Sequence, residues 1–237
     1  MSETPAALRE AHHADVSGGW LRPAVFGAMD GLVTNIALIA GVGGGGVSAR
    51  TIVLTGTAGL VAGAISMGLG EYTSVRSANE QVAAEVAKER RELERHPEAE
   101  ARELADAWVA RGLPRDLATQ VAEAVRRNPE EALRVHVREE LGVDPDDRPS
   151  PWAAAVSSFL FFSVGALVPL VTYLLGVDNL WLALGVGGVG LFAAGAIVAR
   201  FTNRSWLLSG VRQLLLGAAA AAATYLIGAL IGVQGGL

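Results

Sequence analysis

Charged residues are almost entirely confined to one internal segment of this chain, and this uneven distribution constrains the fold more than any other feature. Of 43 formal charges, 31 lie between Arg76 and Arg148, and long stretches on either side carry none. A hydrocarbon core about 30 Å thick requires roughly 20 apolar residues in a helix. Charge-free stretches of that length occupy 51–70, 149–177, 179–199 and 213–237, and 24–47 carries only Asp30. The pattern predicts an all-α chain: a five-span transmembrane helical bundle with a helical insert between spans 2 and 3.

The distribution of basic residues predicts how the spans are oriented. We expect span helices at about 24–47, 52–72, 152–176, 179–199 and 212–234. Lysine and arginine accumulate in cytoplasmic loops, and here they accumulate in the N-terminal segment, in the insert and before the last span. Those parts should therefore share the cytoplasmic side of a cell (inner) membrane, with the C-terminus outside. The expected divisions are 1–22 (N-terminal segment), 23–72 (spans 1–2), 73–150 (cytoplasmic insert) and 151–237 (spans 3–5).

Several functional classes are disfavoured by what the sequence lacks. The chain has no cysteine, which rules out disulfides, thiolate metal sites and a cysteine nucleophile. Its net charge of −5 argues against nucleic-acid binding. No phosphate-binding loop, dinucleotide fingerprint or nucleophile elbow is present. We therefore expect neither an enzyme nor a prosthetic group.

Helix breakers divide the insert into four helical stretches. The helix of the second span should continue to Arg95, because the residue before Pro97 is biased away from helix. Further helices are expected at about 98–110 and 115–127, and a last one from Asn128-Pro129 to Gly142.

Two carboxylates and a thioether mark the membrane segments. Asp30 lies about two turns inside the first span, and ionisable groups at such depth are costly and usually functional. Met67 lies one turn before Glu71 near the inner end of the second span, and together they could bind Fe²⁺ or another first-row divalent ion. Asn35 could add an oxygen ligand. The alternative is that Glu71 only sits at the interface and Met67 only fills the core.

Glutamates recur at helical spacing in the insert. Glu89 and Glu92 are three residues apart, as are Glu100 and Glu103. A hairpin at His96-Pro97 would bring the two pairs together, and carboxylates on facing helices can hold iron or manganese. Either Glu139 or Glu140, with His136 one turn earlier, could complete the site. From the residues alone the plainer interpretation is favoured: solvated glutamates paired with neighbours such as Arg90, Arg91 and Arg102.

Two strings in the membrane segments carry a family resemblance. FGAMDGLVTNIALIAGV (26–42) and AISMGLGEYTSVRS (64–77) resemble the vacuolar iron transporter family, and 158–174 and 204–228 are also similar to it. The resemblance implies that Asp30 and Met67 are pathway residues and that Glu71 belongs to a GEY motif. It also implies that Glu89, Glu92, Glu100, Glu103 and Glu140 are ligands of a cytoplasmic metal-binding domain. Where eukaryotic members carry two methionines, this chain has His136 and Val137, so His136 could supply nitrogen in place of sulfur.

The resemblance also implies an activity. It predicts proton-coupled export of Fe²⁺ from the cytoplasm by a homodimer in the lipid bilayer, with the ion path between subunits. Because oxygen-rich sites separate divalent metals poorly, Mn²⁺, Co²⁺ or Zn²⁺ could also be carried. The alternative is a membrane-tethered metal buffer or sensor that transports nothing.

Overall fold

The computed structural model describes residues 19–202 and 204–235, so His12 and His13 and most of the N-terminal segment lie outside the described part. Over these residues the chain is all-α, with eight helices and no strand. Five of the helices are long and apolar enough to cross a membrane, which confirms the all-α class and the five candidate spans. The helices are α1 (Leu21–Gly44), α2 (Ala49–Arg95), α3 (Pro97–Ala110), α4 (Arg115–Arg126), α5 (Pro129–Leu141), α6 (Pro151–Leu174), α7 (Leu180–Thr202) and α8 (Trp206–Gly235).

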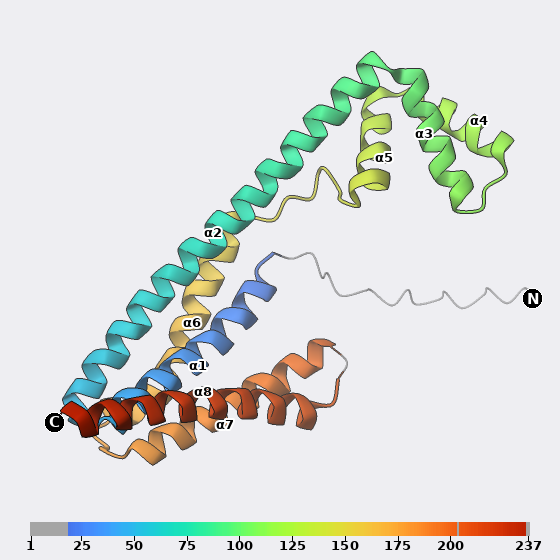
Figure 1. Ribbon diagram of the computed structural model, residues 1–237. Coiled ribbons are helices and arrows are strands. Elements are labelled where there is room, and N and C mark those ends of the chain that lie inside the picture. Colours follow the sequence, from blue (N-terminus) through green and yellow to red (C-terminus); the bar gives the residue numbers. More distant parts are fainter. Residues whose placement is uncertain (1–18, 203, 236–237) are drawn as a thin grey trace, which may run out of the picture.

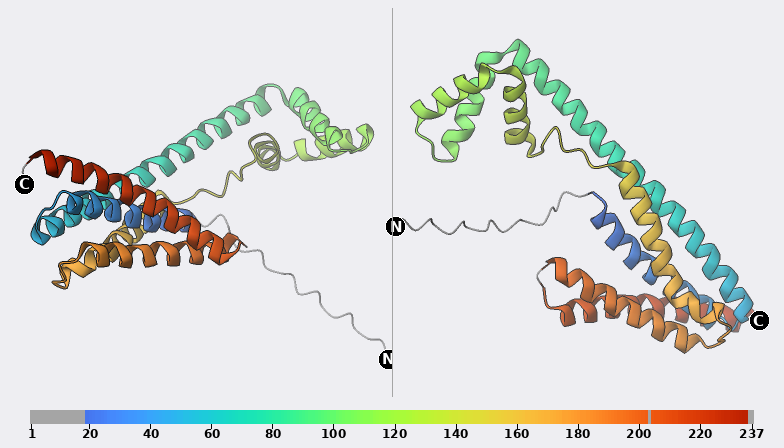
Figure 2. Two further views of the ribbon diagram at one scale, coloured as in Figure 1. Left: turned by 60° about the horizontal axis from the view of Figure 1, so that its bottom comes forward. Right: turned by 180° about the vertical axis from the view of Figure 1, so that it is seen from behind.

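A single helix, α2, connects the spans to the insert. It has 47 residues, which corresponds to a length of about 70 Å at 1.5 Å per residue. Its first half packs against α6 and α1, and its second half extends beyond the other spans to α3, α4 and α5 (Figures 1 and 2). The insert is therefore held away from the spans by a continuous hydrogen-bonded helix.

Several helix ends differ from the expected bounds by a few residues, and the differences at the first and last spans have a local explanation. The first span ends at Gly44 and not at 47, since Gly46 adopts φ 79° in the turn and the Ser48 side chain accepts from Thr51 N–H to cap α2. The last span begins at Trp206 and not at 212. Arg212 had set the expected bound, but α8 simply continues past this arginine.

Aromatic residues lie at both ends of the spans, where they are favoured at membrane interfaces. At the end nearer the insert, Tyr72 packs on Trp152 with ring centroids 4.9 Å apart. At the opposite end, Trp181 packs on Tyr225 at 5.8 Å. Many apolar side chains on the outer faces of the spans are exposed, as expected for surfaces that contact lipid.

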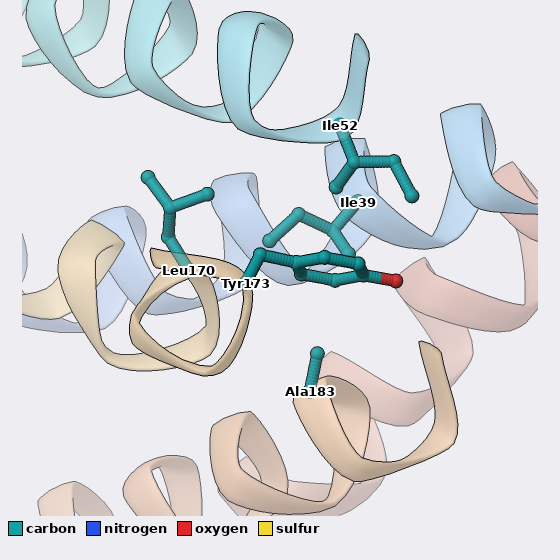
Figure 3. Packing of buried hydrophobic residues seen from close by; sticks show 5 residues of the cluster. All are labelled: Ile39, Ile52, Leu170, Tyr173 and Ala183. Carbon is teal, nitrogen blue, oxygen red and sulfur yellow. The ribbon is translucent and has the colours of Figure 1, made fainter. Parts of the chain in front are cut away.

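The spans pack around α1 through one apolar cluster near the end remote from the insert. Side chains of four helices meet there, and the Tyr173 ring lies between Ile39 and Ala183 (Figure 3). The cluster consists of Ile39 from α1, Ile52 from α2, Leu170 and Tyr173 from α6, and Ala183 from α7.

Small residues let α1 approach α6 closely. A Cβ added to Gly31 would lie 2.2 Å from the Phe162 carbonyl oxygen, and one added to Gly165 would lie 2.2 Å from the carbonyl oxygen of Ala28. Neither position has room for a side chain, so the backbones themselves are in contact, as in other small-residue interfaces in lipid.

A second small-residue interface joins the first span to the last. Gly41 of α1 and Gly45, which directly follows α1, face Gly228 and Gly232 of α8, so that each side contributes glycines four residues apart. A Cβ on Gly228 would lie 1.8 Å from the Gly41 carbonyl oxygen. This spacing is a common helix-pairing motif in membranes, and here it joins two helices of one chain.

The insert has a small core of its own. Ala101, Leu104 and Ala105 of α3 pack on Ala118 and Ala122 of α4. The predicted glycine stop of α5 is confirmed, because Gly142 adopts φ 66°, a left-handed conformation that favours glycine.

Candidate metal site in the insert

Four donor side chains from three helices converge where α2 meets the insert. They are Glu89 of α2, Glu100 of α3, and His136 and Glu140 of α5. One ligand atom from each lies within 4.8 Å of the others. Within the described residues this is the only group of three or more such side chains that could hold a metal ion.

Local sequence positions each of these donors. His96 leaves the helical conformation at φ −131°, and Pro97 starts α3 directly, so α2 and α3 form a hairpin that brings Glu89 and Glu100 together. The third helix of the site is fixed at its start by Asn128, whose side chain accepts from the Glu131 N–H. Within α5, the buried Val137 fixes the face that turns inward.

The His136 imidazole lies at the centre of the group. His136 is 2% exposed. Its Nδ1 is 3.3 Å from Glu89 Oε1, 3.8 Å from Glu100 Oε2 and 3.4 Å from Glu140 Oε1. Adjacent ligands of a tetrahedral ion with bonds near 2.1 Å are separated by about 3.4 Å. The contacts of Nδ1 with Glu89 and Glu140 match this separation, and the contact with Glu100 is longer at 3.8 Å, so the group is compatible with one shared divalent cation.

Carboxylate crowding shifts the pKa values of the site. Burial, followed by the charges of Glu140 and Glu100, raises the pKa of Glu89 to about 7. Burial and the charge of Glu103 raise the pKa of Glu100, although His136 opposes that shift. Oε1 of Glu89 is buried without a hydrogen bond. A divalent cation would relieve the repulsion between the carboxylates and would give this oxygen a binding partner.

The remaining predicted ligands of the insert lie outside this group. Glu92 and Glu103 are not among the four donors, but their charges contribute to the raised pKa of Glu100. Glu139 contacts the guanidinium of Arg111, and Glu140 turns towards His136. Of the two adjacent glutamates, the structure brings only Glu140 into the group.

Two of the three arginines that could have neutralised the glutamate pairs have other partners. Arg90 forms an ion pair with Glu130 of α5 at 2.9 Å. Arg102 Nε donates to the Glu98 carbonyl oxygen at 3.1 Å. Neither contact involves the four donors, so the solvated-pair interpretation does not describe Glu89 and Glu100.

The membrane residues do not form a comparable cluster within the described chain. Asp30 is half-buried on α1, about 14 Å from the start of that helix at 1.5 Å per residue. Its Oδ1 accepts a hydrogen bond from Thr34 at 3.3 Å. Met67 packs against the buried Phe162 and its neighbours, and Glu71 is half-buried beside the interfacial Tyr72.

Two polar residues of the first span have clear structural roles. Asn35 is 1% exposed, and its Nδ2 donates to the Ala166 carbonyl oxygen at 2.5 Å. Its Oδ1 has no hydrogen-bond partner among the described residues. Thr34, the partner of Asp30, was not identified from the sequence, although its position one turn after Asp30 was a usable signal.

Comparison with proteins of similar sequence identifies the family of this chain. Residues 21–229 match the VIT family model. The chain is 36% identical to the vacuolar iron transporter of Acanthamoeba castellanii, covering 95% of this chain and 84% of that protein. It is 32% identical to vacuolar iron transporter 1 of rice, covering 95% and 92%, and 30% identical to vacuolar iron transporter 1 of Arabidopsis thaliana, covering 93% and 90%. The chain belongs to the VIT family, the vacuolar iron transporters, which are membrane transporters and not enzymes.

Proposed function

We propose that this protein exports Fe²⁺ from the cytoplasm in exchange for protons. The observation that carries the proposal is the group Glu89, Glu100, His136 and Glu140, one member of which, Glu89, lies on the helix that continues from the second span. Glu89 lies 18 residues beyond Glu71 in α2, or about 27 Å along the helix axis. The insert would collect the cation, with Glu92 and Glu103 as additional ligands.

The direction of transport follows from the proposed orientation. The insert holds 13 basic residues, which favours the cytoplasmic side of a cell membrane. Metal ligands on that side would collect ions from the cytoplasm, and the ions would leave at the opposite end of the spans.

Asp30, Met67 and Glu71 are the proposed intramembrane ligands. A thioether and carboxylates suit Fe²⁺, a borderline ion. A bound divalent cation disfavours the protonated form of a nearby carboxyl. Alternate binding of metal and proton at Asp30 or Glu71 would therefore couple the two flows.

A second copy of the chain would complete this membrane site. Thr34 is the hydrogen-bond partner that the described residues give Asp30. One carboxylate with one hydroxyl is too small a ligand set for a divalent ion. In a homodimer, the same residues of the partner chain would supply the missing ligands.

Proteoliposomes containing the purified protein would test transport. We expect a pH gradient with the acidic side inside the liposomes to drive Fe²⁺ uptake by molecules whose insert faces outwards. Asp30→Asn should lower the flux at least about tenfold, since the carboxylate is the costly and functional group in the span. Asp178→Asn, in the exposed loop between α6 and α7, is the matched control and should transport normally.

Two results would contradict this proposal. Flux that does not respond to the pH gradient would exclude proton coupling. Metal binding by the insert without any flux would instead support a membrane-tethered buffer or sensor. Competition by Mn²⁺, Co²⁺ and Zn²⁺ in the same assay would rank the metals carried.

A further inference from the structure

The insert site contains a nitrogen donor that is held rigidly among oxygen donors. His136 is almost completely buried on α5, between the buried Leu133 and Val137 of the same helix. Its side chain therefore has little freedom to turn away from the site. Its Nδ1 faces carboxylates from α2, α3 and α5 at 3.3–3.8 Å.

The geometry favours binding of one ion by the imidazole and the carboxylates together. Nδ1 lies 3.3 Å from Glu89 and 3.4 Å from Glu140, the separation expected of neighbouring ligands, and 3.8 Å from Glu100, so the imidazole is placed to share an ion with these carboxylates. Oε1 of Glu89, which lacks a hydrogen bond, faces the same nitrogen. Nδ1 is within hydrogen-bond distance of Glu140 Oε1 at 3.4 Å, so Glu89 Oε1 stays unsatisfied beside it and is free to bind a shared cation.

We propose that His136 makes the insert site selective, so that it binds Fe²⁺, Co²⁺ and Zn²⁺ in preference to Mn²⁺. Imidazole nitrogen suits iron and zinc, whereas carboxylates and water suit manganese, magnesium and calcium. Across the divalent first-row series, affinity rises from Mn²⁺ through Fe²⁺ and Co²⁺. Replacing one oxygen donor by nitrogen steepens this rise. The inference rests on the proposed metal-collecting role of the insert and adds the class of ion that it accepts.

Metal binding to the full-length protein in detergent, at one fixed pH, tests the selectivity. His12 and His13 are replaced by Asn in every sample, so that they cannot contribute nitrogen ligands. Co²⁺ binding is followed by visible absorption, and competing Mn²⁺ is followed by electron paramagnetic resonance. We expect the site to prefer Co²⁺ to Mn²⁺ by at least about tenfold.

The decisive variant is His136→Asn, which keeps a polar amide near the position of Nδ1 but removes the imidazole. We expect its Co²⁺ affinity to fall about tenfold and its Mn²⁺ affinity to change less than about threefold, so that the preference for Co²⁺ narrows by at least about threefold. His96→Asn is the matched control, because His96 is the other histidine of the described residues and is exposed. It should keep the preference.

If His136→Asn weakens the binding of Co²⁺ and Mn²⁺ equally, the histidine has a purely structural role and the inference is overturned. An unchanged ratio of the two affinities, or no metal binding by the parent protein, would also overturn it. If the His136→Asn variant does not fold, the X-ray absorption spectrum of the Co²⁺-loaded His96→Asn protein decides, because His136 is then its remaining histidine. Imidazole scattering is expected there, and its absence would refute the proposal. Loss of Fe²⁺ flux with this selectivity intact would contradict the proposed transport alone.

Discussion

Nδ1 of His136 lies 3.3 Å from Oε1 of Glu89, although the two side chains come from different helices and this oxygen forms no hydrogen bond. The pair joins α5 to the far end of the helix that crosses the membrane. It therefore connects the candidate metal site mechanically to the spans, and the properties of both residues lead to measurable expectations.

Metal affinity of the insert should rise with pH. The pKa of Glu89 is raised to about 7, so below that pH the carboxyl holds a proton that a cation must displace. Isothermal titration with Fe²⁺ under anaerobic conditions should show affinity increasing about tenfold from pH 6 to pH 8, and then levelling off. In Glu89→Gln this contribution to the slope should vanish, and an unchanged slope would assign the proton to another group.

Glu100→Gln should weaken metal binding by the insert about tenfold, which corresponds to 1.4 kcal/mol. The residue lies in the first turn of α3 and points into the four-donor group. Transport should then need more Fe²⁺ to reach half its maximal rate, while the maximal rate itself changes little. Glu98→Gln, in the same turn but exposed, is the control, and equal effects of the two changes would count against the site.

Glu139 and Glu140 should differ sharply although they are adjacent. Glu139 contacts Arg111, and Glu140 contacts His136. We expect Glu140→Gln to reduce metal affinity about tenfold and Glu139→Gln to leave it within about twofold, because Glu139 is paired with Arg111 and lies outside the four-donor group. Equilibrium dialysis of the two variants would measure this, and the reverse order would reassign the ligand.

Gly31→Ala should destabilise the span bundle by about 1–3 kcal/mol through overpacking. The added Cβ would lie 2.2 Å from the Phe162 carbonyl oxygen and push α1 away from α6. Gly70→Ala is the control, because a Cβ there has nothing within 4 Å, and alanine gains up to about 1 kcal/mol in a helix interior. Thermal unfolding in detergent would compare them, and a loss of the same size at both positions would refute the close-packing argument.

The sequence alone determined the number and type of the helices. Lipid tolerates few charges, so the charge-free stretches that begin after Arg50, Arg148, Asp178 and Arg212 outlined four of the spans directly. Proline and glycine residues that end helices divided the insert in the same way, including the helix end at Gly142. Helix bounds set by charge alone failed at Arg212, because a helix passes through an interface without a break.

Only the tertiary structure decided which side chains share a site. The glutamates of the insert look alike in sequence. In the structure, however, Glu89 and Glu100 lie beside His136, whereas Glu139 contacts Arg111. The close contacts of Gly31 with α6 and of Gly228 with α1 were equally invisible in the sequence. Helical spacing fixes which face of a helix a residue occupies. Which neighbour that face meets depends on the packing of helices that are far apart in the chain.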